Sequence, residues 1–129
     1  MKVAEPEIHL IPYSYRGQIT ITFGINTGSV AEYDEAGRRI YKIGQDGILN
    51  TRFSPNMGIR PPENFQYYLV ENDKQTILPN AADKDNEPIT LVVSDVYVTQ
   101  EKLYYFIDAL ENIKKYKNPT IDENERKIK

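Results

Sequence analysis

Hydrophobic and polar residues alternate through most of the first two thirds of the chain. In the segment 18–23, Ile19, Ile21 and Phe23 alternate with two threonines. A period of two residues is typical of a strand with one face in a core and one in water. Pairs such as Asp46-Gly47 suit hairpin turns, where the glycine adopts a positive φ. The pattern predicts about seven short strands, within residues 8–11, 18–23, 38–43, 48–53, 65–70 and 76–78, and in one apolar region formed by 89–93 and 96–98.

The period changes after Thr99. From Leu103 to Ile113, apolar residues recur at spacings of three, four and seven positions, which is typical of an amphipathic helix. Pro119 cannot continue such a helix. The sequence therefore predicts one C-terminal amphipathic helix over about residues 99–117.

Strands followed by a single helix favour a mainly β fold. A parallel α/β sheet would need helices between its strands, so we expect an antiparallel β-sandwich with a transthyretin-like or Ig-like layout. We expect residues 1–117, helix included, to form one domain, and residues 118–129 to form a flexible charged tail. The breaker-rich segment 54–62 is expected to cross between the sheets.

The amino-acid composition excludes several classes of site and partner. The 129 residues include no Cys, which excludes a disulfide scaffold, a Cys-ligated metal site and thiol chemistry. The 16 Lys and Arg against 19 Asp and Glu give a formal net charge of −3, whereas nucleic-acid-binding proteins usually carry a basic patch. We expect no nucleic-acid partner, and no cofactor, because the sequence has neither a phosphate-binding loop nor a dinucleotide fingerprint.

The sequence leaves two compartments open. No stretch approaches the ~20 apolar residues of a membrane span, and the first ten residues hold no apolar run typical of a signal peptide. If a leader was removed from a precursor, we expect a protein of the cell envelope or a secreted one, with a lipid anchor as an option. Otherwise we expect a cytoplasmic protein.

No catalytic motif is present in the sequence, so we expect no enzyme. His9 is the single histidine, and its place in an alternating segment predicts a partly exposed strand residue rather than a general base. A carboxylate-dependent hydrolase is a third alternative, but glycosidase pairs come from separate strands. The sequence offers only local acidic groups, which are Asp34 with Glu35, and Asp83 with Asp85 and Glu87.

The second acidic group also resembles part of a calcium-binding loop, because oxygen-bearing side chains occupy alternate positions. The segment lacks the glycine and the distant bidentate Glu of an EF-hand. A solvated loop is therefore favoured, with a calcium site formed by Asp83, Asp85 and Glu87 as the alternative.

Tyrosine is unusually frequent, with ten residues against no Trp. Tyrosines can build an aromatic platform for a sugar or a peptide, although they are also favoured in strands. Arg38 and Arg39 lie beside Tyr41 and could clamp an anion; alternatively, one Arg stacks on Tyr41 at a solvated edge. We predict a binding surface formed by Arg38, Arg39, Tyr41 and Tyr33.

Three motifs between residues 11 and 58 occur in an order that resembles an uncharacterised bacterial domain family. The resemblance covers about residues 8–70 and implies a small β-rich protein, often exported or of lipoprotein type, with no known activity to carry over. The motifs are Ile11-Pro12-x-x-Tyr15-x-Gly17-x-Ile19-x-Ile21, Tyr33-x-x-x-Gly37-Arg38-Arg39-Ile40-Tyr41-x-Ile43 and Gly47-Ile48-Leu49-x-Thr51-x-Phe53-x-Pro55-Asn56-x-Gly58.

Two functional hypotheses follow. The first is a non-catalytic binding or accessory domain of the bacterial cell envelope, with a protein or glycan partner. The alternative is a cytoplasmic protein–protein interaction module that pairs through its helix or an open sheet edge. The helix version predicts an exposed apolar stripe at Leu103, Phe106, Leu110 and Ile113.

Overall fold

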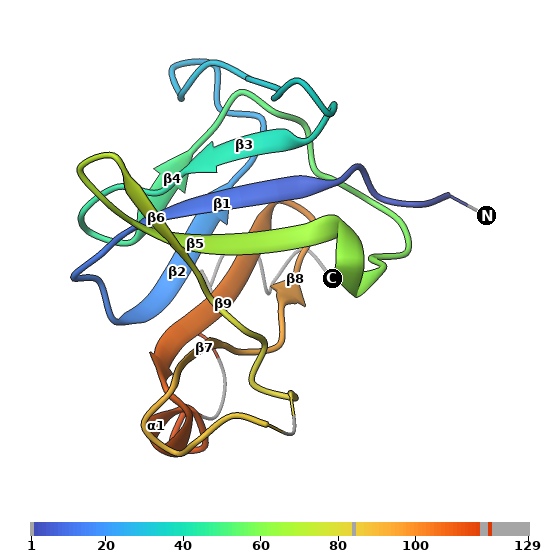
Figure 1. Ribbon diagram of the computed structural model, residues 1–129. Coiled ribbons are helices and arrows are strands. Elements are labelled where there is room, and N and C mark those ends of the chain that lie inside the picture. The colour runs from blue at the N-terminus through green and yellow to red at the C-terminus, as the bar shows by residue number, and fades with distance from the viewer. Residues whose placement is uncertain (1, 84, 117–118, 120–129) are drawn as a thin grey trace.

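The structure is a computed structural model that describes residues 2–83, 85–116 and 119. Two β-sheets pack against each other, and one short helix follows the last strand (Figure 1). The predicted mainly β fold with a C-terminal helix is confirmed. The predicted tail at residues 118–129 lies outside the described residues, except for Pro119.

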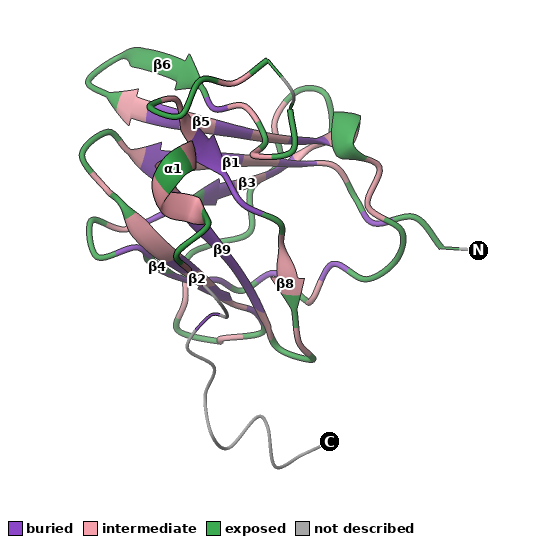
Figure 2. Cartoon of the chain, turned by 90° about the horizontal axis from the view of Figure 1, so that it is seen from below, coloured by how far each residue is buried: buried purple, intermediate pink, exposed green. Residues whose placement is uncertain are grey.

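The first sheet has the strand order β3-β1-β5-β6. It comprises β1 (Glu7–Pro12), β3 (Arg39–Lys42), β5 (Phe65–Glu71) and β6 (Lys74–Ile77). Strand β1 is central and runs parallel to both β3 and β5, whereas β6 is antiparallel to β5. The edge strand β6 is exposed along its whole length (Figure 2).

The second sheet has the order β4-β2-β9-β7, with β8 also paired to β9. Strands β2 and β4 are parallel, and the pairs made by β9 are antiparallel. The strands are β2 (Gly17–Thr22), β4 (Ile48–Asn50), β7 (Leu91–Val93), β8 (Tyr97–Val98) and β9 (Lys102–Ala109).

Both sheets are mixed, which corrects the antiparallel arrangement expected from the sequence. The first five strands alternate between the sheets, so each crosses to the opposite layer before the chain returns. Two crossings restore the original direction, and strands two apart in the chain therefore pair in parallel. For the same reason, Asp46-Gly47 turns the chain from β3 to β4 across the layers and does not close a hairpin.

The helix predicted over residues 99–117 is wrong for most of its length. Residues 102–109 form β9, and α1 spans only Leu110–Ile113. Leu103 and Phe106 are buried in β9, so they form no exposed stripe. The run Leu103–Ile107 is apolar or aromatic at every position and is buried on both faces of the strand, a pattern that periodicity cannot distinguish from a buried helix.

The outer face of β9 is covered by the segment that follows it. Phe106 stacks on Tyr116, with ring centroids 4.4 Å apart. On the inner face, alternate residues of both sheets contribute to one core (Figure 2). Its fully buried members include Ile11 and Tyr41 from the first sheet, and Ile19, Ile21, Leu103, Tyr105 and Ile107 from the second.

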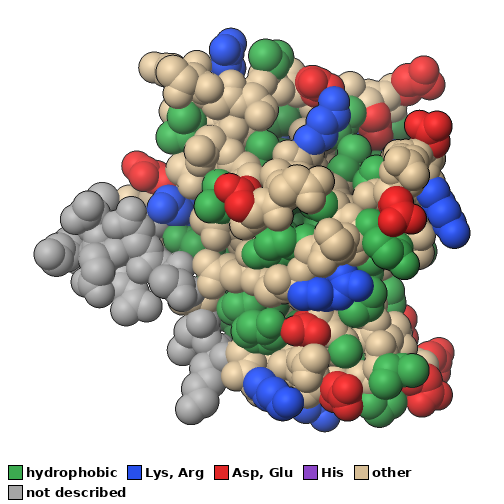
Figure 3. Space-filling view, turned by 90° about the vertical axis from the view of Figure 1, so that its left-hand side faces the viewer, with side chains coloured by type: hydrophobic (Ala, Val, Ile, Leu, Met, Phe, Trp, Pro, Cys, Tyr) green, Lys and Arg blue, Asp and Glu red, His purple; other side chains and the backbone are tan. Residues whose placement is uncertain are grey.

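The surface outside this core is mixed in charge. On the face seen in Figure 3, acidic and basic side chains are interspersed with small apolar patches. No helix in the described part of the chain has the length and apolar character that a membrane span requires.

Candidate functional site

Two ionisable side chains enter the core from β1. Glu7, His9 and Ile11 occupy alternate positions and all point inward, and Glu7 and His9 are both 0% exposed. The expectation that His9 is partly exposed was therefore wrong. Burying a charge is costly unless it is paired and hydrogen-bonded, so the surroundings of Glu7 decide what this cluster does.

The Glu7 carboxylate accepts hydrogen bonds from four side chains. Asn56 Nδ2 donates at 2.7 Å, His9 Nε2 at 2.8 Å, Arg60 Nη2 at 2.9 Å and the Tyr41 hydroxyl at 3.1 Å. Burial alone would raise the pKa of Glu7, but the bonds from His9 and Arg60 outweigh it and lower the pKa to about 2. Glu7 is therefore ionised at neutral pH.

His9 links Glu7 to the second sheet. Because an ionised carboxylate only accepts, Nε2 must carry a hydrogen, and Nδ1 of the neutral ring then accepts from the Tyr105 hydroxyl of β9 at 2.8 Å. Burial lowers the pKa of His9 despite the neighbouring carboxylate, which keeps the ring neutral. Tyr105 is fully buried, and burial raises the pKa of its hydroxyl well above the ordinary value. The chain Glu7–His9–Tyr105 thus bridges the two sheets and offers no hydroxyl to solvent.

Arg60 connects this buried cluster to the surface. Its side chain is 18% exposed, and both Nη atoms face Glu7. The guanidinium carbon lies 4.0 Å from the centre of the Phe65 ring, so Arg60 is stacked as well as paired. Arg60 is also hydrogen-bonded to Tyr67, whose pKa is raised to about 12, chiefly by burial.

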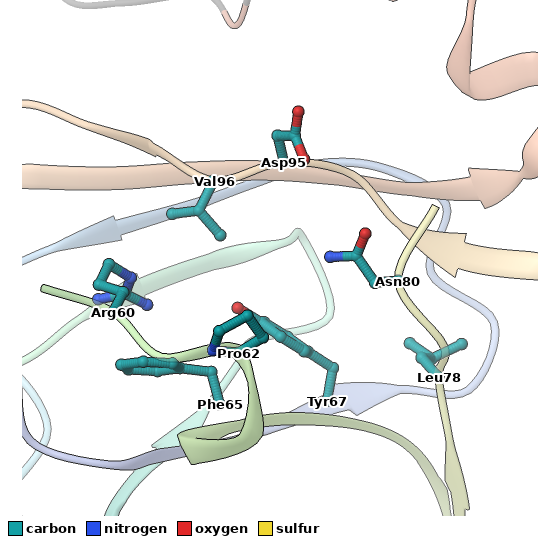
Figure 4. Close-up of a pocket in the computed structure, with 8 residues that line it drawn as sticks. All are labelled: Arg60, Pro62, Phe65, Tyr67, Leu78, Asn80, Asp95 and Val96. Atoms are coloured by element: carbon teal, nitrogen blue, oxygen red, sulfur yellow. The ribbon is translucent and has the colours of Figure 1, made fainter. Parts of the chain in front are cut away.

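Arg60, Phe65 and Tyr67 form one wall of a cavity between the sheets (Figure 4). Phe65 and Tyr67 come from the start of β5, where alternate residues face inward. The cavity has a volume of about 510 Å³, within the usual range for small-molecule sites. The other lining residues are Pro62, Leu78 and Asn80, and Asp95 with Val96 from the connection between β7 and β8.

The cavity combines apolar walls with a polar group, the amide nitrogen of Asn80, that remains open to a ligand. Asn80 Oδ1 accepts from the backbone of Ala82, and its amide nitrogen makes no hydrogen bond within the described residues. Asp95 is exposed, and its carboxylate points away from the cavity, on the opposite side of the backbone from Val96 (Figure 4). A few convergent polar groups in an apolar cavity are typical of binding sites for small molecules.

Two of the predicted binding residues, Arg39 and Tyr41, are buried. Arg39 Nε donates to Glu5 at 2.6 Å, and its Nη1 donates to the backbone oxygen of Ser54. Tyr41 donates to Glu7 and so belongs to the buried cluster.

The other two predicted residues lie nearer the surface. Tyr33 is exposed and donates to Glu5, which places it beside Arg39. Arg38 is half-buried and pairs with Asp34 at 2.6 Å and with Gln66. That Arg38, Arg39, Tyr41 and Tyr33 bind a ligand stays a prediction, and the structure brings only Tyr33, Arg39 and Tyr41 toward one side of β3.

The structure does not assemble the acidic groups singled out in the sequence. Asp83, Asp85 and Glu87 are exposed, and no three His, Asp or Glu side chains of the described residues gather as a metal site requires. The calcium alternative therefore has no ready-made ligand set there. Glu7 is the only buried carboxylate of the described chain, so the pair that a hydrolase would need is not formed.

Sequence reasoning missed Arg60, Tyr67, Asn80 and Asp95. The alternation Glu7-x-His9-x-Ile11 was a usable signal, since it places both polar residues on the same strand face as Ile11. Arg60 lies in the breaker-rich loop 54–62, and its partner Glu7 is 53 positions away. No local pattern could have joined them.

Comparisons with known proteins agree with this fold. A family model described as "Family of unknown function (DUF6843)" matches residues 3–90. The crystal structure described as "Putative Lipoprotein from Bacillus anthracis" is similar, with a TM-score of 0.59 and 15% identity over 98% of this chain and 90% of that chain. No curated protein matches the sequence. The expected resemblance to a β-rich family of unknown function is confirmed.

Proposed function

This chain belongs to the family of unknown function DUF6843, and we propose that it is a non-catalytic binding module that takes a small ligand into the cavity between its sheets. The observation that carries the proposal is the fixed polar wall of that cavity. Arg60 is held by Glu7 on one side and by Phe65 on another. A wall ordered before the ligand arrives lowers the entropic cost of binding.

The chemistry of the buried cluster favours binding over catalysis. Glu7 is ionised, and its oxygens already accept hydrogen bonds from four side chains. His9 is enclosed by Tyr41, Tyr67 and Tyr105, with ring centroids 4.5–5.3 Å away. A general acid or base must come within hydrogen-bond reach of its substrate, and neither Glu7 nor His9 is accessible.

The proposed binding test is titration of the 15N-labelled full chain with a fragment library, observed by NMR. Ligands are expected to shift the amides of Arg60, Tyr67, Asn80 and Val96 together. Val96→Trp would fill the cavity and abolish these shifts, whereas Val98→Trp, at an exposed position on β8, would leave them unchanged. Shifts that survive Val96→Trp would overturn the cavity as the site.

We further propose that the module belongs to the bacterial cell envelope, with a leader or lipid anchor on its precursor. Support comes from the fold shared with a protein described as a putative lipoprotein. Fractionation of the source cell, followed by intact-mass analysis of the purified protein, should find a processed or lipidated N-terminus in the membrane or exported fraction. An unprocessed chain in the cytosol would contradict the envelope assignment.

The second candidate is a protein–protein interaction module that pairs through a sheet edge. Strand β6 favours it, because this edge strand is exposed throughout and carries the exposed Ile77. Analytical ultracentrifugation should then find a dimer that Ile77→Lys converts to a monomer. A wild-type monomer at all concentrations would remove self-pairing from this candidate.

A further inference from the structure

We infer that the cavity recognises an uncharged ligand with a carbonyl oxygen on an apolar body, and that the Tyr67 hydroxyl and the Asn80 amide are its hydrogen-bond donors. The inference rests on the proposed function and specifies the ligand class of the same cavity. It follows from which polar atoms of the lining are already bonded within the protein and which face the cavity without a partner (Figure 4).

Tyr67 places a buried hydroxyl on the wall of the cavity. The residue is 8% exposed, and in Figure 4 its hydroxyl lies between Arg60 and Asn80. The hydroxyl oxygen accepts a hydrogen bond from Arg60, because a guanidinium group can only donate. The hydroxyl hydrogen meets no acceptor within the described residues. A buried donor without a partner costs free energy, which an oxygen atom of a ligand would recover.

Asn80 adds a second donor. Its Oδ1 accepts from the backbone N–H of Ala82 at 2.8 Å, which fixes the amide so that Nδ2 faces the other way. Figure 4 shows Nδ2 directed into the space between Val96 and Tyr67. Asn80 is an exposed residue, and Nδ2 donates to no acceptor in the described part of the chain. Both groups that await a partner are therefore donors, and their complement is an acceptor oxygen.

The charges of the site favour an uncharged ligand. Both Nη atoms of Arg60 face the fully buried Glu7, at 2.9 and 3.3 Å, so the pair carries no net charge. Asp95 turns its carboxylate away from the cavity (Figure 4). An anionic ligand would compete with Glu7 for Arg60, whereas a cation would meet only donors among the unpaired polar groups of the described lining side chains. A neutral carbonyl group avoids both costs.

The remaining walls suit an apolar body rather than a sugar ring. Pro62, Leu78 and Val96 offer aliphatic surface. The guanidinium carbon of Arg60 lies 4.0 Å from the centre of the Phe65 ring and closes one of its faces to stacking. A sugar would also bring several hydroxyl donors, for which the described lining side chains hold no unpaired acceptor.

Three probes that share one cyclohexyl ring separate charge from hydrogen-bonding character. At about pH 7, cyclohexanone is a neutral acceptor, cyclohexanecarboxylate is an anionic acceptor and cyclohexylammonium is a cationic donor, because carboxyl groups are ionised and alkyl amines are protonated there. In NMR titrations of the 15N-labelled full chain, cyclohexanone is expected to shift the amides of Tyr67, Asn80 and Val96 and to bind most tightly of the three.

The first donor is tested with Tyr67→Phe, which removes the hydroxyl and keeps the ring. It is expected to weaken cyclohexanone by about two- to ten-fold, the range for one neutral hydrogen bond. Tyr68→Phe is the matched control, because Tyr68 is the next residue of β5 and its hydroxyl bonds Gln66 on the other face of the strand. It should leave the affinity unchanged.

The second donor is tested with Asn80→Asp, in which the retained Oδ1 can still accept from Ala82. The change replaces a donor with a negatively charged acceptor, so it should weaken cyclohexanone and tighten cyclohexylammonium. A merely structural role of Asn80 would not move the two probes in opposite directions. Asn50→Asp, at an exposed position on β4, is the matched control and should change neither.

The outcomes separate this inference from the proposed function. Tighter binding of cyclohexanecarboxylate or cyclohexylammonium than of cyclohexanone in the cavity would leave the binding module standing and overturn the carbonyl preference. Equal cyclohexanone affinity in wild type, Tyr67→Phe and Asn80→Asp would overturn the two donors. An absence of cavity shifts with the fragment library and all three probes would overturn the proposed function, and the inference with it.

Discussion

At the scale of single residues, Glu7 is the shared acceptor of the buried hydrogen-bonded cluster. Its carboxylate is buried and joins Arg60, His9, Tyr41 and Asn56. Glu7→Gln removes the charge but keeps the volume, and so leaves the Arg60 cation without a counter-charge. Urea denaturation at neutral pH should show a loss of about 3 kcal/mol in the free energy of unfolding.

Glu5→Gln is the control for that loss. Glu5 also pairs with an arginine, Arg39, but its side chain is 47% exposed. Exposed ion pairs contribute up to about 1 kcal/mol, so the control should cost less than that. If Glu7→Gln and Glu5→Gln lost the same free energy of unfolding, burial would not explain the contribution of Glu7 to stability.

His9 gives the folded chain a pH dependence near neutrality. Its pKa is lowered by burial, so below about pH 6.5 the unfolded chain takes up a proton that the folded chain resists. Stability is therefore present above that pH and is lost as the pH falls, by up to about 1.4 kcal/mol per pH unit. Because His9 is the single histidine, urea midpoints between about pH 7.5 and 5.5 should report this group.

Glu7 also makes the folded chain less stable as the pH falls, but over a lower pH range than His9. Its pKa is about 2 in the folded chain, against about 4.3 for an ordinary Glu. The stability it contributes is present above the unfolded value and is lost as the pH falls toward 2. The two windows are separable, because His9→Gln should flatten the curve near neutrality, whereas the bond from Arg60 to Glu7 should still give an acid limb. A slope that persists near neutrality in His9→Gln would contradict the assignment.

At the scale of elements, β9 is the centre of the second sheet. It pairs with β2 over six residues and also with β7 and β8. Amides paired on both sides and covered on both faces should open only with global unfolding. Hydrogen exchange is expected to be slowest in β9 and fastest in β6, and strand-type chemical shifts should cover residues 102–109. Helical shifts there would contradict the strand.

The sequence predicted where most strands lie but not how they pair. Alternation identified segments that match β1, β2, β3 and β5 within a few residues, because the burial of one face imposes a period of two. The two-residue alternation does not show which strands pair with each other. The crossing of each early strand to the other sheet could therefore not be predicted from it. In the site, the inward faces of Glu7 and His9 were readable from the strand, whereas Arg60 reaches them only through tertiary structure.

At the scale of the whole molecule, the cavity exists only in the folded chain. Its walls come from segments 60–67, 78–80 and 95–96, which are the start of β5 with the loop before it and the connections that follow β6 and β7, and which are distant in sequence. A ligand of the cavity therefore binds the native state and not the unfolded one. At ten times its dissociation constant, it should raise the free energy of unfolding by about 1.4 kcal/mol.

Thermal unfolding can detect this linkage without labelling the protein. A fragment that shifts the amides of the cavity residues is expected to raise the midpoint in proportion to the logarithm of its concentration, and a fragment that shifts none of them is not. Val96→Trp should abolish the rise while Val98→Trp retains it, since only Val96 lines the cavity. A rise of equal size in Val96→Trp would place the binding elsewhere on the fold, and the wall formed by Arg60 and Tyr67 would then be structural.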